Sequence, residues 1–263
     1  MDLQLRDKSA FISGSSQGIG YAIAAALAAE GVQVTLNGRD AGRLASAVER
    51  LDAEYPASHP KGLVADFSRS EEVAQLTASM GEVDILINNV GLFDLAPFES
   101  IDDEEWARYF EVNVMSAVRL ARHALGGMLQ RGWGRMIFIN SESAVNVPAD
   151  MVHYGATKAA MLALSNGLAK LTRGTGVTVN TVLGGPTYSD GVAATVDAIA
   201  AAQSVPLDAM KAAIIGANRT SLLERFIEPS EIAHMVAYLS SPVSSATNGA
   251  ALRADGGVLT GIV

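Results

Sequence analysis

Two patterns of hydrophobic residues alternate along the chain. Short runs rich in valine, isoleucine and leucine are followed by longer stretches in which apolar residues recur at helical spacing. The short runs predict seven strands, at residues 8–13, 32–37, 62–65, 83–88, 135–140, 177–182 and 250–254. The longer stretches predict helices at residues 19–30, 41–54, 71–80, 103–129, 152–171 and 229–239. Because helical crossovers connect parallel strands, this order predicts an α/β fold.

One segment departs from this alternation. Residues 184–226 contain no strand pattern, only a Gly-Gly-Pro turn followed by alanine-rich helical sequence. Insertions of this kind in α/β folds often cover the site, so we expect a substrate lid at about 184–226. No repeat or linker divides the sequence, and we expect a single domain over residues 1–263.

The composition narrows the possible chemistry. Of the 263 residues, 49% are hydrophobic, 18% are charged and none is cysteine. Such a chain can build a large core, but it can form neither disulfides nor a site that needs cysteine as ligand or nucleophile. No pair of histidines has metal-ligand spacing, so we expect no metal site.

The charge balance indicates which partners to expect. The formal net charge is −9 and the basic residues form no cluster, which argues against nucleic acid and an anionic membrane as partners. The first residues, MDLQLRDK, lack the order of a signal peptide, and the longest strongly apolar run, residues 21–29, is too short to span a membrane. We therefore expect a cytoplasmic protein that acts on a small molecule.

Three glycines stand where the first strand leads into the first helix. Residues 13–20 read S-G-S-S-Q-G-I-G, with Gly14, Gly18 and Gly20 in the spacing G-x-x-x-G-x-G. Glycines allow a tight turn and a close approach of the backbone to a pyrophosphate, whose charge the helix N-terminus stabilises. This variant of the dinucleotide fingerprint favours a nucleotide site over a turn that serves packing alone.

The end of the second strand indicates which dinucleotide is bound. A site for NAD usually places a carboxylate there to accept the ribose hydroxyls, but the chain reads Asn37-Gly38-Arg39. Arg39 can pair with a 2′-phosphate, which favours NADP. The neighbouring Asp40 keeps NAD possible, and a solvated surface arginine is the alternative interpretation of Arg39.

The strongest chemical signal is a tyrosine with a lysine four residues later. Tyr154 and Lys158 share one helix face, and Ser141 ends the preceding strand. A phenol has a pKa of about 10, and a nearby ammonium group lowers this pKa towards the range useful for acid–base catalysis. The Ser141 hydroxyl can donate to a substrate oxygen on which charge develops. An ordinary surface pair of tyrosine and lysine is the alternative.

Together these residues resemble the short-chain dehydrogenase/reductase family over almost the whole chain. Residues 13–20 are similar to the family's T-G-x-x-x-G-I-G, residues 88–91 (N-N-V-G) to its N-N-A-G, residues 154–158 to its Y-x-x-x-K and residues 255–257 to its D-G-G. Ser141 lies 13 residues before Tyr154, as is usual in the family, and Asn113 matches its helix asparagine.

The resemblance implies a Rossmann-type, doubly wound parallel sheet of seven strands in the order 3-2-1-4-5-6-7, with three α/β/α layers and assembly as a homotetramer. It implies hydride transfer between a nicotinamide cofactor and a carbonyl or alcohol. Tyr154 would be the general acid or base, and Lys158 would lower its pKa and hold the nicotinamide ribose. Ser141 would orient the substrate oxygen, and Asn113 would position a water in a proton relay.

The resemblance also implies the residues that bind the cofactor. Ile19 would contact the pyrophosphate or the nicotinamide side, Asp66 the adenine, and Asn89 and Gly91 the adenosine ribose. After the sixth strand Gly184 replaces the family's usual proline, and Ser189 would take the role of its threonine. The full set is Gly14, Ser16, Gln17, Gly18, Ile19, Gly20, Asn37, Arg39, Asp66, Asn89, Gly91, Tyr154, Lys158, Pro186, Thr187 and Ser189.

By family position, the substrate pocket is expected to be lined by Phe93, Tyr188 and residues 143–147 and 151–153. His153 would either bind a polar substrate group or lie at the rim of the pocket. Neighbouring side chains on a strand point to opposite faces, so Glu142 is expected to face away from the site.

The resulting prediction is an NADP-preferring carbonyl reductase or alcohol dehydrogenase, with NAD possible, acting on a secondary alcohol and its ketone. One alternative is a catalytically silent dinucleotide-binding regulatory module, which the intact tetrad disfavours. A 3-oxoacyl thioester reductase is another, which the acidic balance disfavours because the carrier protein is itself acidic. A dehalogenase-type lyase is disfavoured because it would have arginine in place of Lys158.

Overall fold

The protein is described by a computed structural model of residues 2–217 and 221–262. Residues 218–220 of the predicted lid, and residues 1 and 263, lie outside the described residues. The strands form one parallel sheet in the order β3-β2-β1-β4-β5-β6-β7, which confirms the predicted topology. They are β1 Ser9–Ile12, β2 Gln33–Gly38, β3 Lys61–Val64, β4 Ile85–Asn88, β5 Trp133–Ser141, β6 Gly176–Gly184 and β7 Ala251–Ala254.

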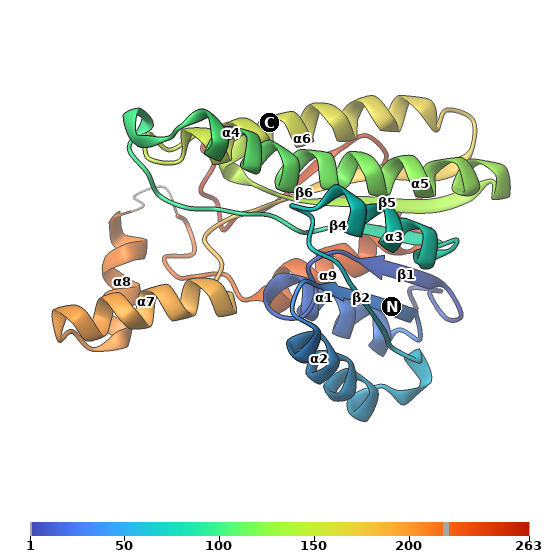
Figure 1. Cartoon of the computed structure of the whole chain (residues 1–263), viewed down its shortest axis with the longest axis horizontal. Coiled ribbons are helices and arrows are strands. Elements are labelled where there is room, and N and C mark those ends of the chain that lie inside the picture. Colours follow the sequence, from blue (N-terminus) through green and yellow to red (C-terminus); the bar gives the residue numbers. More distant parts are fainter. Residues whose placement is uncertain (1, 218–220, 263) are drawn as a thin grey trace.

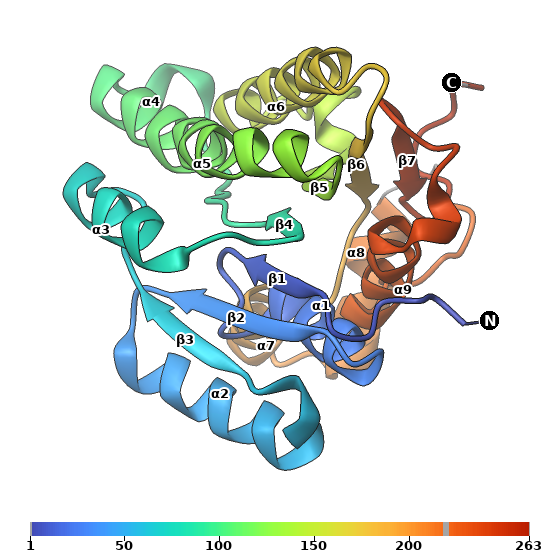
Figure 2. The same ribbon diagram turned by 90° about the vertical axis from the view of Figure 1, so that its right-hand side faces the viewer.

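Helices cover both faces of the sheet (Figures 1 and 2). One face carries α1 Gly18–Ala29, α2 Ala41–Glu54 and α9 Pro229–Ser240. The other carries α3 Ser70–Met80, α4 Asp103–Tyr109, α5 Ser116–Arg131 and α6 Val152–Leu171. Each layer closes over its own apolar core, which includes Leu27 and Val236 on the first face and Leu120 and Met161 on the second. The predicted three-layer α/β/α arrangement is therefore confirmed.

Local sequence explains where several helices begin. The Asp40 side chain accepts from the Arg43 backbone N–H at the start of α2, and Asp102 does the same for Glu105 at the start of α4. Helix α9 begins with Pro229 after a capping box between residues 228 and 231. These contacts satisfy backbone N–H groups that have no partner inside the helix.

The prediction of one regular helix over residues 103–129 is wrong. Helix α4 ends at Tyr109, a π-helical turn spans Phe110–Met115, and α5 then continues to Arg131. Asn113 lies inside the π turn, and its buried side chain bonds to segments outside the helix. A π turn adds one residue to a helical turn, and helical periodicity continues on both sides of it. The hydrophobic pattern therefore does not reveal it.

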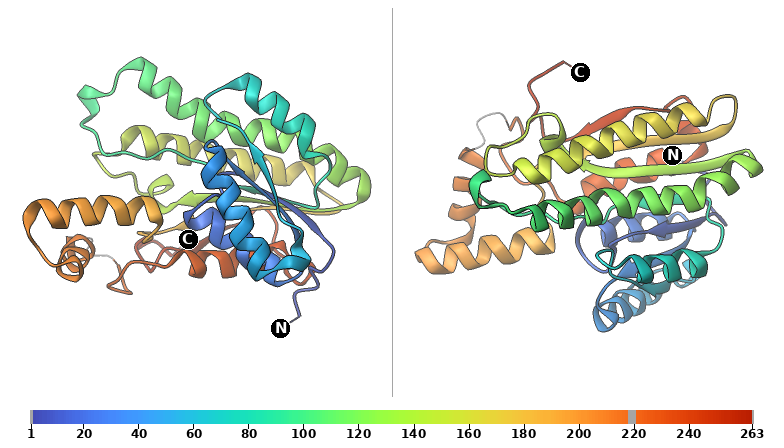
Figure 3. Two further views of the ribbon diagram at one scale, coloured as in Figure 1. Left: turned by 60° about the horizontal axis from the view of Figure 1, so that its bottom comes forward. Right: turned by 45° about the horizontal axis from the view of Figure 1, so that its top comes forward.

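The segment after β6 forms α7 Asp190–Gln203 and α8 Leu207–Ala217, which project beyond the carboxyl ends of the strands (Figures 1 and 3). This confirms the predicted helical character. Val196, Met210 and Phe226 are among the residues of a small separate core between these elements. Within the described residues, no single helix is long and apolar enough to span a membrane. Helices α7 and α8 reach that length and hydropathy only when taken together, and the chain bends by 110° between them.

Candidate active site

The backbone of the turn between β1 and α1 requires glycine at three positions. Gly14 and Gly18 both have a φ of +61°, a conformation that favours glycine. A Cβ on Gly20 would lie 2.4 Å from the Gly14 carbonyl oxygen and 2.8 Å from the Ser15 Cα, both backbone atoms that cannot move aside. The turn thus leaves the N-terminal N–H groups of α1 open towards the cleft.

This N-terminus already holds a negatively charged group. The Asp190 carboxylate, from the first residue of α7, accepts a hydrogen bond of 2.6 Å from the Gly18 backbone N–H. The positive end of the helix dipole and the free N–H groups favour an anion at this position. The carboxylate stands in for a phosphate oxygen, so the residues of the turn fit a pyrophosphate.

Side chains from three strand ends hold the turn in shape. Asn37 accepts from the Gly14 N–H and donates to the Leu63 carbonyl, while Asn89 donates to the Ser13 and Gly14 carbonyls. The Ser13 hydroxyl accepts from the backbone N–H groups of residues 89 and 90, so serine here performs the hydrogen bonding expected of the family's threonine. Asn37 and Asn89 therefore position the backbone of the turn.

One end of the cleft lies beyond β2 and β3. Ser16, Asn37, Arg39, Gly91 and Asp66 line it, as expected of the adenosine end. Burial raises the pKa of Asp66, but hydrogen bonds from Ser68 and then the charge of Arg39 outweigh this effect, and the pKa lies below its usual value. Asp66 is therefore ionised at neutral pH, and its contact with the adenine stays a prediction.

A second arginine at this end escaped the sequence analysis. Arg43 lines the same cavity as Arg39, four residues further on in the first turn of α2, and donates to the Gln17 side chain at 3.1 Å. Asp40 is engaged in capping α2, although it borders the cavity. The sequence signal that could have identified Arg43 is its position four residues after Arg39, on the other side of the Asp40 cap of α2.

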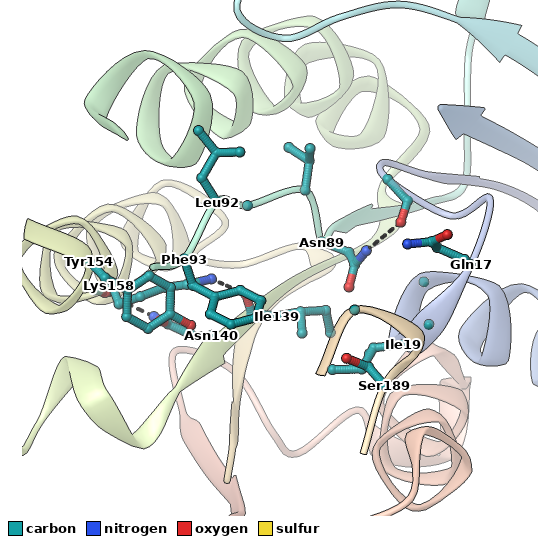
Figure 4. Close-up of a pocket in the computed structure, with 16 residues that line it drawn as sticks. Gln17, Ile19, Asn89, Leu92, Phe93, Ile139, Asn140, Tyr154, Lys158 and Ser189 are labelled. Carbon is teal, nitrogen blue, oxygen red and sulfur yellow. Dashed lines mark hydrogen bonds between the residues drawn. The ribbon is translucent and has the colours of Figure 1, made fainter. Parts of the chain in front are cut away.

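The other end of the cleft contains the predicted catalytic pair. Tyr154 and Lys158 lie together on α6, and Gln17, Ile19 and Ser189 lie on the opposite side of the pocket (Figure 4). Phe93 borders this pocket and meets the Tyr154 ring edge-on at 6.4 Å, as predicted for a pocket residue. Gly14, Gly18, Gly20, Asn89 and Gly91 also line it. Asn89 therefore lines this end of the cleft, and its contact with the adenosine ribose stays a prediction.

Lys158 is held by the end of β5. Its Nζ donates to the Ile139 carbonyl at 3.2 Å, and the Asn140 side chain donates to the Lys158 backbone carbonyl at 3.0 Å. Burial lowers the pKa of Lys158 to about 8, although the charge of Glu142 opposes this effect. Asn140 was not predicted as a site residue; it fixes the turn of α6 that carries the lysine.

The pKa of Tyr154 lies above that of an ordinary phenol, whereas the sequence analysis expected it to lie below. Burial raises its pKa well above the ordinary value, the nearby Ser141 hydroxyl lowers it, and the charge of Glu142 raises it again. The Lys158 Nζ lies 5.5 Å from the ring centroid. Burial is the largest influence on the phenol pKa, and a lowering of this pKa by Lys158 stays a prediction. Tyr154 is a protonated donor at neutral pH.

The expectation that Glu142 faces away from the site is wrong. Strand β5 ends at Ser141, and a 3-10 turn, Glu142–Ala144, follows at once. In this turn the alternation of an extended strand no longer applies, and the Glu142 carboxylate returns to the Ser141 hydroxyl, which donates to it at 2.7 Å. Burial raises the pKa of Glu142.

Asn113 ties the loop after β4 to α6. Its side chain accepts from the Leu92 N–H at 2.7 Å, and donates to the Leu92 carbonyl and to the Thr157 hydroxyl, each at 3.0 Å. Both amide hydrogens are thus occupied. These contacts make Asn113 a brace for the cleft wall, and its part in a water relay stays a prediction.

We expect Asn113→Ala to lower the free energy of unfolding by about 2 kcal/mol, because it leaves part-buried backbone groups of Leu92 without partners. Urea denaturation measures this change. Asn146→Ala, at an exposed position of the same residue type, is the control and should stay within about 0.5 kcal/mol of wild type. A loss no larger than that of the control would contradict the bracing role.

Lys158 should make stability depend on pH. Above a pH of about 8 the folded protein holds a neutral amine, whereas the unfolded chain stays charged up to 10.5. The unfolded state then binds more protons, so stability rises with pH in this window. We expect the free energy of unfolding of wild type, relative to Lys158→Met, to rise by about 2 kcal/mol between pH 8 and about pH 10. Lys170→Met, exposed on the same helix, should not remove this slope.

Three residues after β6 are predicted to bind the cofactor, and one of them lines the cleft. Ser189 lines the pocket, as expected. Thr187 is buried, with its hydroxyl bonded to the Gly185 carbonyl, and the Pro186 carbonyl accepts from Ile227. The described pockets include neither Pro186 nor Thr187, so their contact with a cofactor stays a prediction.

Two residues predicted to line the substrate pocket point elsewhere. Tyr188 packs on Phe226 at 5.6 Å and under the Lys211 ammonium, within the helical segment after β6. His153 is only 1% exposed and stacks on Tyr109 at 4.0 Å. Both expectations for His153, a substrate contact and a rim position, are therefore wrong. In residues 2–217 and 221–262, no group of three or more acidic or histidine side chains is arranged to hold a metal ion.

Known proteins resemble this chain over its whole length. The sequence model of the family described as short chain dehydrogenase matches residues 8–199. The uncharacterized oxidoreductase YvaG of Bacillus subtilis is 43% identical, covering 100% of both chains. The 3-oxoacyl-(acyl-carrier-protein) reductase FabG of Escherichia coli is 31% identical, covering 97% of this chain and 99% of its own. L-Sorbose reductase from Gluconobacter frateurii, solved with NADPH and L-sorbose, has a TM-score of 0.93 at 31% identity, covering 100% of both chains.

Proposed function

Because the chain belongs to the short chain dehydrogenase family, we propose that it is an NADP(H)-dependent oxidoreductase that interconverts a secondary alcohol and its ketone, with Tyr154 as general acid or base. The observation that carries this proposal is the arrangement of one cleft. Its centre is a glycine turn that fits a pyrophosphate, Arg39 and Arg43 lie at one end, and Tyr154 and Lys158 lie at the other.

The residues have separate tasks in this proposal. Gly14, Gly18 and Gly20 would hold the pyrophosphate, Arg39 and Arg43 the 2′-phosphate, and Lys158 the nicotinamide ribose. When bound, the nicotinamide supplies or accepts the hydride. The protein supplies the proton and the enclosed surroundings.

Tyr154 and Ser141 act on the substrate oxygen. During reduction this oxygen gains negative charge, and the phenol of Tyr154, which is protonated at neutral pH, donates its proton there. A hydrogen bond from the Ser141 hydroxyl stabilises the same charge. Phe93 meets the ring of Tyr154 edge-on and forms part of the apolar wall beside it.

The test is a panel of ketones assayed with NADPH and with NADH. Keto sugars, keto esters, cyclic ketones and 3-oxoacyl thioesters are offered, and loss of the reduced nicotinamide absorbance is recorded. We expect turnover of at least one class, with NADPH preferred. Binding of NADPH without turnover of any class would instead support a silent regulatory module.

A 3-oxoacyl thioester reductase is the second candidate, and the similarity to FabG of E. coli favours it. Its natural partner would be an acidic carrier protein, which the net charge of −9 repels. If thioesters are the substrate, we expect free acyl thioesters to be reduced about as well as carrier-bound ones. A strong preference for the carrier would contradict the charge argument.

Assembly is proposed to be a homotetramer, following the resemblance to the family. Light scattering coupled to size-exclusion chromatography tests this directly. A mass equal to that of one chain, 27.4 kDa, would reject the assembly.

A further inference from the structure

Glu142 is an ionisable group at the catalytic centre that the proposed reaction leaves without a task. It follows β5 directly, and its carboxylate accepts a hydrogen bond of 2.7 Å from the Ser141 hydroxyl. Asp255, at the end of β7, and the Tyr154 and Lys158 pair of α6 are close enough to interact with its charge. A carboxyl group in this position affects the hydroxyl that should contact the substrate.

The hydrogen bonds of Ser141 can be counted. Its hydroxyl has one proton and two lone pairs. The proton goes to Glu142, and one lone pair accepts from the Ser143 backbone N–H at 3.1 Å. With Glu142 ionised, Ser141 therefore has no proton left to donate to a substrate oxygen, and it presents a lone pair to the developing negative charge.

We propose that Glu142 is a positioning residue that sets the direction in which Ser141 donates its hydrogen bond. When Glu142 carries a proton, its own O–H donates to the Ser141 oxygen, and the Ser141 hydroxyl turns to the substrate. When Glu142 is ionised, it withdraws that hydroxyl from the substrate. This inference rests on the proposed function. It makes ketone reduction depend on the protonation of two groups, the Tyr154 phenol and the Glu142 carboxyl.

The groups around the Glu142 carboxyl determine the pH at which it loses its proton. Burial raises its pKa, the hydrogen bond from Ser141 lowers it, and the charge of Asp255 raises it again. Asp255 is itself paired with Arg253 at 3.1 Å. On α6, Tyr154 faces the carboxyl as a neutral phenol at neutral pH, and Lys158 is close enough for the charge of Glu142 to raise its pKa. The net effect is a pKa above the ordinary value, so the protonated form persists to a higher pH than in a free glutamate.

Kinetics test the inference through the pH profile of ketone reduction. In wild type, kcat/KM should fall about tenfold per pH unit above the pKa of Glu142, across a scan from about pH 5 to pH 9. Glu142→Gln should abolish this fall, because its amide donates to Ser141 at every pH. Glu49→Gln, at an exposed position of α2, is the matched control and should keep the wild-type profile. The inference is overturned if Glu142→Gln falls with pH as wild type does.

A second measurement needs no turnover. In protein labelled with ¹³C at the glutamate carboxyls, the resonance absent from Glu142→Gln belongs to Glu142, and its titration gives the pKa. We expect a value above 4.5, and a further rise in Ser141→Ala, which removes the donor to the ionised form. A pKa at or below 4.5, or one that Ser141→Ala leaves unchanged, overturns the inference. Absence of any turnover in the ketone panel would reject the proposed function alone, since this titration still decides the role of Glu142.

Discussion

Tyr154→Phe should lower kcat for ketone reduction by about a thousandfold, whereas the affinity for NADPH should change by less than about threefold. The substitution removes the phenol proton and keeps the ring, which lies edge-on to Phe93. A thousandfold loss corresponds to about 4 kcal/mol of activation free energy, which is within the range that proton transfer by a positioned side chain supplies. Steady-state kinetics with saturating NADPH measure the loss.

Two controls separate chemistry from folding in this variant. NADPH binding is followed by quenching of tryptophan fluorescence, and the melting temperature reports on the fold. Tyr238→Phe, on the opposite layer and partly exposed, removes an equivalent hydroxyl and should leave kcat within about twofold of wild type. A Tyr154→Phe enzyme with near-normal kcat would show that the proton comes from another group.

The double variant Arg39→Ala/Arg43→Ala should weaken NADPH binding by about a hundredfold, and NADH binding by less than about threefold. Both guanidinium groups border the cavity beyond β2, where only NADP carries a phosphate. Charge-assisted hydrogen bonds to phosphate are among the strong ones, and two are lost together. Isothermal titration with each nucleotide measures the two affinities.

The comparison between the nucleotides is the internal control for this variant, and Arg122→Ala is the external one. Arg122 is an exposed arginine of α5, so its substitution makes a charge change on the other face of the sheet. It should alter neither affinity by more than about twofold. Equal losses for NADPH and NADH in the double variant would reject the phosphate assignment and restore NAD as the expected cofactor.

The elements that could be predicted are those whose signal is local. The strand-to-helix turn was recognisable because Gly14, Gly18 and Gly20 lie within seven residues of one another, and the backbone conformation of the turn itself requires them. Tyr154 and Lys158 were recognisable because helical spacing alone brings them to one face. The alternation of strands and helices predicted the sheet because each strand and its crossover are contiguous in the chain.

Two of the predictions that were wrong concern contacts between distant segments. His153 was assigned to the pocket because it adjoins Tyr154 in sequence, but in α6 it points to Tyr109, a residue of another helix. The π turn around Asn113 depends on Leu92 and Thr157, which lie 21 and 44 residues away. No periodicity in a single segment contains that information.

By itself, the sequence determined the order of the elements, the parallel sheet and the residue types of the catalytic group, because propensity, periodicity and turn chemistry act over a few residues. The tertiary structure alone decided how these groups are charged and where they donate. The pKa values of Tyr154 and Lys158 follow from burial between β5, α6 and the loops, and the hydrogen bond of Glu142 follows from the turn that ends β5. Burial and hydrogen-bond geometry are properties of the packed molecule, since they depend on neighbours that the chain brings together only when it folds.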